Sequence, residues 1–99
     1  MGWSYGGGTR SALQMNQLGQ QMAHVLPARQ WRTVRVLFDT LEHADGPFVF
    51  DAVVAYRYAE VFRAAAAHPK MPADWGRFAL DIADHASASI RSGQSWRWS

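Results

Sequence analysis

Apolar residues recur at helical spacing in four stretches of the chain, which are separated by prolines, glycines and short polar turns. After Ser11, a good N-cap, Met15, Leu18 and Met22 fall on one side of a helix, and Pro27 ends the pattern. The pattern therefore predicts four amphipathic helices. They are expected at residues 11–26, 28–43, 52–67 and 72–92.

The second of these stretches has two interpretations. Val34 and Phe38 lie on the buried arc of a helix, but together with Val36 they also alternate as in a β-strand. We favour the helix, and the strand remains open for residues 32–38. After this stretch, "HADGP" predicts a turn, and "FVF" predicts a short strand or an extended linker that ends at Asp51.

Residues 1–10 and 94–99 carry aromatic side chains two positions apart, and an extended segment places such side chains on one side. Three interpretations remain open for these tails. They fold back onto the helices as short paired strands, which we favour; they offer an aromatic patch to a partner; or they are disordered. Trp and Tyr dominate interface energies, which supports the second interpretation. The rings concerned are Trp3, Tyr5, Trp96 and Trp98.

With 99 residues, 48% of them hydrophobic, the chain has the size of one domain with one modest core. We predict a mainly α fold spanning residues 1–99, with the tails as a minor β element. The absence of cysteine excludes disulfides, thiolate zinc sites and a cysteine nucleophile. No signal-peptide pattern and no long apolar run occurs, so we expect a cytoplasmic protein that does not bind membranes.

The first predicted helix has no charged residue, since none occurs between Ser11 and Ala28. Interface centres are depleted of charge, so we predict that this face binds another protein or a second copy in a homodimer. Gly19 borders the apolar stripe, where its missing side chain lets another backbone approach. The predicted partner-binding residues are Leu13, Gln14, Gln17, Gln20, Gln21 and His24, with Trp3, Tyr5, Trp96 and Trp98 of the tails.

The formal charge is only +2, but the second predicted helix is polarised. Arg29, Arg32 and Arg35 lie toward its N-terminal end and Asp39 and Glu42 toward its C-terminal end, the reverse of what the helix dipole favours. The mismatch costs roughly 0.3–1 kcal/mol per charge at low salt. A solvated face with Arg35 paired to Asp39 accounts for it, and an acidic partner or nucleic acid bound by the three arginines is the alternative.

Two histidines follow an aspartate by four residues, as His43 follows Asp39 and His85 follows Asp81. Two ligands do not make a metal site, and no His-x-x-x-His pair occurs. We therefore expect no metal, no cofactor and no catalytic residue. The predicted function is a non-enzymatic protein-interaction module that acts as an adaptor, regulator or inhibitor. A nucleic-acid-binding regulator is the alternative.

"GWS" near the start, "MPADWG" before the last predicted helix and "WRWS" at the end give the chain a recognisable pattern. In this pattern it resembles short uncharacterised proteins of actinobacteria and their phages. The resemblance implies an actinobacterial, intracellular setting. It transfers no activity and no functional residue.

Overall fold

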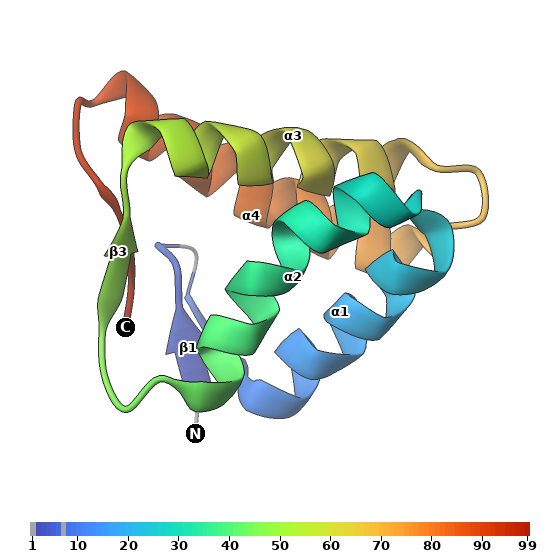
Figure 1. Cartoon of the computed structure of the whole chain (residues 1–99), viewed down its shortest axis with the longest axis horizontal. Helices are drawn as coiled ribbons and strands as arrows, with labels where there is room; N and C mark the ends of the chain where they lie inside the picture. Colours follow the sequence, from blue (N-terminus) through green and yellow to red (C-terminus); the bar gives the residue numbers. More distant parts are fainter. Residues whose placement is uncertain (1, 7) are drawn as a thin grey trace.

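The computed structural model describes residues 2–6 and 8–99, which form four helices and four short strands (Figure 1). The helices are α1 (Ala12–Val25), α2 (Ala28–His43), α3 (Ala52–Ala67) and α4 (Ala73–Arg91). The strands are β1 (Gly2–Ser4), β2 (Thr9–Ser11), β3 (Phe48–Phe50) and β4 (Trp96–Trp98). The predicted mainly α fold with a minor β element is confirmed.

Residues 32–38 belong to α2, so the strand interpretation is wrong. Val34, Leu37 and Leu41 are buried at helical spacing, and this packing outweighs the β-propensity of the valines. Pro27 and Pro72 are the N-caps of α2 and α4. Pro27 thus precedes its helix as the range 28–43 predicts, whereas Pro72 was expected as the first residue of its helix and lies one position before it. "FVF" forms β3 rather than a linker.

Side-chain caps fix the starts of α1 and α3. Ser11 Oγ accepts a hydrogen bond from Gln14 N, and Gln14 Oε1 accepts one from Ser11 N, which together form a capping box. Asp51 Oδ1 accepts from Val54 N at 2.9 Å. These caps satisfy N–H groups that have no partner within the helix.

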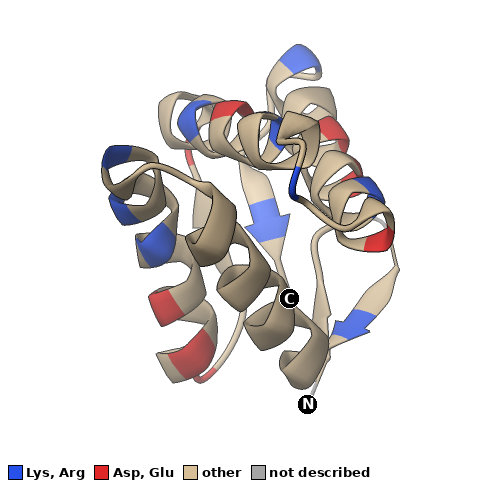
Figure 2. Cartoon of the chain, turned by 90° about the vertical axis from the view of Figure 1, so that its right-hand side faces the viewer, with Lys and Arg blue, Asp and Glu red and all other residues tan. Residues whose placement is uncertain are grey.

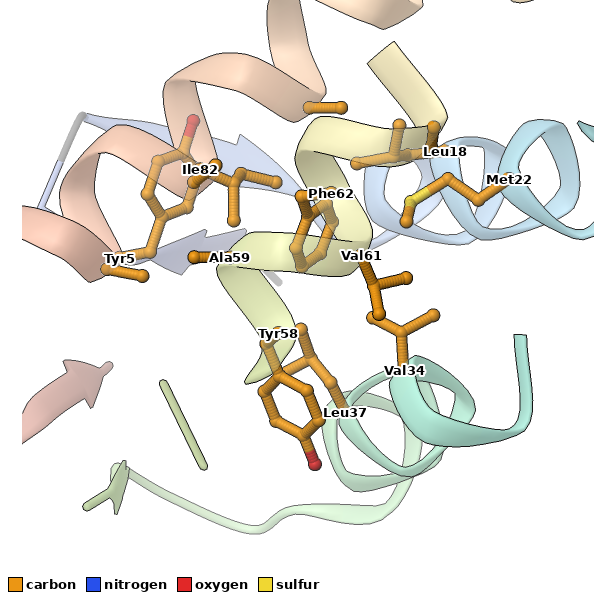
Figure 3. Close-up of a cluster of buried hydrophobic side chains, with 14 of the residues drawn as sticks. Tyr5, Leu18, Met22, Val34, Leu37, Tyr58, Ala59, Val61, Phe62 and Ile82 are labelled. Carbon is orange, nitrogen blue, oxygen red and sulfur yellow. The ribbon is translucent and has the colours of Figure 1, made fainter. Parts of the chain in front are cut away.

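The core is formed where α3 and α4 run side by side and α1 and α2 cover them (Figure 1). Ala59 of α3 and Ala83 of α4 are buried, and such small side chains let the two helices approach closely. Figure 3 shows Phe62 of α3 beside Leu18 and Met22 of α1 and Ile82 of α4. One core therefore joins all four helices.

The two tails fold back onto this core, as the favoured interpretation predicts. β1 pairs with β2 and β4 pairs with β3, both antiparallel. The backbones of Ser4 and Ser99 exchange two hydrogen bonds, with N–O distances of 2.7 and 2.9 Å, so the tails also meet each other. Along β4, Trp96 and Trp98 are buried and Arg97 is exposed, which is the alternation expected of a half-covered strand.

Candidate functional site

The outer surface of α1 carries no charged side chain, whereas α2 beside it carries both signs (Figure 2). Four of the predicted partner-binding positions on α1 are exposed polar side chains, and Gln21 is half-buried. Leu13 is 66% exposed, although it is large and apolar. The exposed polar positions are Gln14, Gln17, Gln20 and His24.

A cleft of about 520 Å³ lies between α1 and α2. Its volume falls within the range of pockets that hold ligands or anchoring side chains. Leu13 and Gln20 line the cleft from the charge-free helix, whereas Gln14, Gln17, Gln21 and His24 do not. The lining comprises Trp3, Ala12, Leu13, Met15, Asn16, Gly19, Gln20, Ala23, Trp31, Arg35, Phe38, Asp39, Leu41 and Glu42.

Gly19 has no side chain, which leaves space for an aromatic ring in the wall of the cleft. A Cβ atom at Gly19 would lie 3.1 Å from Phe38 Cδ1, a tight contact, so the absent side chain makes room for the Phe38 ring. The prediction that another backbone approaches Gly19 is therefore wrong, because a side chain takes the space. The Trp31 ring stacks on Phe38 at a centroid distance of 5.8 Å, so two adjacent aromatic rings line this part of the cleft.

The rings of the two tails do not form an exposed aromatic patch. Tyr5, Trp96 and Trp98 are at most 2% exposed, since they pack into the core. The prediction that these three residues bind a partner is therefore wrong, because a partner cannot reach side chains that are buried in the folded chain. Trp3 is half-buried, contacts Phe48 edge to face at 5.3 Å, and lines the cleft at the N-terminal end of α1.

The three arginines of α2 are exposed near the start of that helix, and Asp39 and Glu42 are exposed near its end (Figure 2). Arg35 Nε lies 3.6 Å from Asp39 Oδ2, which confirms the predicted ion pair. Both side chains of this pair are more than half exposed, so solvent screens it strongly. Within residues 2–6 and 8–99, Arg29, Arg32 and Glu42 make no ion pair.

In both aspartate–histidine pairs, the histidine ring contacts the backbone carbonyl of the aspartate four residues before it. His43 Nδ1 lies 2.9 Å from Asp39 O, and His85 Nδ1 lies 2.7 Å from Asp81 O. Because a carbonyl oxygen only accepts, each Nδ1 carries a proton and donates it. No group of three or more acidic or histidine side chains in the described part of the chain is arranged to hold a metal ion.

Sequence reasoning missed the partner of Asp81. The hydroxyl of Tyr5 donates to Asp81 Oδ2 at 2.6 Å, and the Tyr5 ring meets the His85 ring edge to face at 5.4 Å. Burial, followed by this hydrogen bond, raises the pKa of Tyr5 to about 12. A phenol that stays protonated is a poor base. The hydrogen bond from Tyr5 to Asp81 instead holds the N-terminal tail against α4. No local pattern could have indicated a contact between residues 76 positions apart.

The described residues thus define a small, mainly helical domain whose first two helices enclose a cleft lined by aromatic, amide and charged side chains. The chain belongs to the family described as Domain of unknown function (DUF7739), whose model matches residues 2–99. This confirms the resemblance to proteins without an assigned activity, and the family description specifies no organism. Neither the curated proteins nor the solved structures contain a match. Among the residues that the structure describes, no helix has both the length and the apolar character needed to cross a bilayer.

Proposed function

We propose that this chain is a non-enzymatic protein-interaction module, an adaptor, regulator or inhibitor, whose docking site is the cleft between α1 and α2. The occupant is a partner protein that inserts a large apolar side chain against Trp31 and Phe38. One observation carries the proposal: the charge-free wall of α1, with Leu13 66% exposed, borders an aromatic-lined cleft of about 520 Å³. Anchors in such pockets dominate interface energies.

The absence of charge on α1 favours its being covered by a protein. Covering an unpaired charge removes its hydration, which is costly, whereas an amide keeps its hydrogen bonds by exchanging water for a partner's polar groups. Gln20 Nε2 already donates to Asn16 Oδ1 at 3.1 Å and keeps a second N–H free for a partner. This wall therefore loses little on binding.

The alternative is a nucleic-acid-binding regulator that uses Arg29, Arg32 and Arg35. Their exposure supports it, but the same face of α2 carries Asp39 and Glu42, which repel phosphates. Arg35 is also paired to Asp39 within the helix. We therefore favour the protein partner, and we place the protein in the cytoplasm of an actinobacterium, on the resemblance given above.

Photo-crosslinking in an actinobacterial host tests the docking site. A photoreactive amino acid at Gln20, inside the cleft, is expected to give one discrete protein adduct on ultraviolet exposure. The same group at Ala88, exposed on α4, gives none and serves as the matched control. Mass spectrometry identifies the adduct.

A substitution at Leu13 distinguishes an adduct formed by specific docking from one formed by chance proximity. Leu13→Asp places a charge beside the cleft without touching the core, since Leu13 is largely exposed, and it is expected to abolish the Gln20 adduct at unchanged melting temperature. Equal adducts from Gln20 and Ala88 would contradict the proposal. So would co-purified nucleic acid that disappears with nuclease while no protein adduct forms.

A further inference from the structure

The α2 wall of the cleft changes from aromatic to acidic along its length. Four lining residues are spaced three or four positions apart and so follow one row along the helix: Trp31, Arg35, Phe38 and Glu42. Trp31 begins this row near the short connection between α1 and α2, and its ring stacks on that of Phe38. Glu42 ends the row, far from the connection. A segment in the cleft therefore meets aromatic rings first and a carboxylate last.

The carboxylate of Glu42 has no cation to balance it. Arg35 Nε lies 3.6 Å from Asp39 Oδ2, so these two lining residues pair with each other. Glu42 makes no ion pair within residues 2–6 and 8–99. The facing wall supplies no cation either, because α1 contains no lysine or arginine. The described lining of the cleft thus keeps one carboxylate that a cation of a partner can pair with.

We propose that the partner segment in the cleft carries a lysine or arginine close to its apolar anchor, and that this cation pairs with Glu42. The inference rests on the proposed function, since it specifies the chemistry of the same occupant. Phe38 and Glu42 are four residues apart, which is about 6 Å along a helix axis. Positions i and i+3 or i+4 of a helical segment span this distance, as do positions i and i+2 of an extended one.

Leu13 favours a long basic side chain at this end of the cleft. It lies near the start of α1, and α1 and α2 are connected at their other ends, so Leu13 and Glu42 line the same end. Leu13 is 66% exposed. The aliphatic stems of lysine and arginine cover apolar surface while their charged groups stay hydrated. Leu13 and Glu42 together therefore match the stem and the charge of such a side chain.

The same features disfavour other occupants. An acidic segment or a nucleic-acid backbone would place like charges beside Glu42. A second copy would have to insert a different surface into this cleft, and such a head-to-tail contact leaves the cleft of one copy empty unless the copies close into a ring. The occupant is therefore a basic and apolar segment of a different protein.

A display library of short random peptides, selected on the purified chain, tests this chemistry. A photoreactive amino acid at Gln20 identifies the peptides that sit in the cleft, and the same group at Ala88 is the control. The peptides linked through Gln20 are expected to carry lysine or arginine two to four positions from a large apolar residue. The same selection on a Glu42→Lys variant is expected to yield aspartate or glutamate at that position instead.

Fluorescence anisotropy with one selected peptide measures the effect on affinity. Glu42→Lys opposes like charges and is expected to weaken binding at least about tenfold. Replacing the base of the peptide by glutamate is expected to restore most of this loss. Glu60→Lys, exposed on α3 and outside the cleft, makes the same change of net charge and is expected to keep the wild-type affinity. Glu42→Lys places a cation where the helix dipole favours it, so the variant is expected to melt no lower than the wild type.

Three results would overturn the inference: Gln20-linked peptides without an excess of basic residues, a Glu60→Lys variant weakened as much as Glu42→Lys, or a Gln20 adduct in cells with the intact mass of two copies of the chain. The first result leaves the proposed function intact, because a partner still docks in the cleft. A chain that gives neither an adduct in cells nor a linked peptide would refute both.

Discussion

Replacing Trp96 by alanine is expected to lower the free energy of unfolding by about 3–5 kcal/mol, a large share of the total for a domain of this size. Trp96 is 1% exposed and packs against Trp98 and Phe50, with ring centroids 5.2 and 6.1 Å away. Its indole N–H donates to the carbonyl of Tyr5 at 3.2 Å. Truncation leaves a cavity and a buried acceptor without a donor. Denaturant unfolding followed by circular dichroism measures the loss.

Two phenylalanine variants separate the hydrogen bond from the packing. The indole N–H of Trp98 is buried and has no acceptor among the described residues, so Trp98→Phe removes an unsatisfied donor. Trp96→Phe instead leaves the Tyr5 carbonyl unpaired, and we expect it to cost about 1–3 kcal/mol more than Trp98→Phe. A Trp96→Ala variant within about 0.5 kcal/mol of wild type, as for a surface position, would contradict the packed tail.

Raising the pH from 10 to 12 is expected to remove about 2 kcal/mol of stability through Tyr5 alone. Burial and the hydrogen bond to Asp81 raise the pKa of Tyr5 from 10.0 to about 12, so the folded state holds a proton that the unfolded chain releases. The contribution of the Tyr5 phenol to the free energy of unfolding is fully present well below pH 10 and is lost as the pH rises toward 12. Unfolding free energies at about pH 8 and about pH 11 measure its onset.

Tyr5→Phe is the matched variant, because it keeps the buried ring and cannot ionise. Its deficit relative to the wild type is expected to be constant below pH 10 and to shrink above it. Tyr58, whose pKa is also raised by burial, remains in both proteins, so its titration cancels in the comparison. A deficit that does not change with pH would show that the Tyr5 phenol does not carry this linkage.

The helices were predictable because their signals are local. Ser11 and Asp51 mark helix starts through side-chain caps, Pro27 and Pro72 immediately precede helices, and the apolar spacing identifies the buried sides. The arrangement of the tails was only partly predictable. Alternation placed Trp96 and Trp98 on one side of an extended segment, but nothing local could show that β3 is the strand that covers them.

The candidate site was predictable to a similar degree. The charge-free helix, including Leu13 and Gln20, follows from the sequence alone. The cleft does not, because it depends on how the rings of Trp31 and Phe38 on α2 settle against α1, and Gly19 gave only an indirect sign of close approach. The contact of Tyr5 with Asp81 depends on tertiary folding and has no counterpart in local pattern.

The bond from Trp96 to Tyr5 joins residues 91 positions apart, and this has a consequence for synthesis on the ribosome. At about 5–20 residues per second, the N-terminal tail waits for several seconds before β4 has been made. During that interval α1, α2 and the helical pair α3–α4 can form from nearby residues, whereas Tyr5 lacks Trp96 and Trp98. The contact between the two tails therefore forms only after residues 96–98 have been made, and until then the N-terminal segment lacks the rings that cover Tyr5.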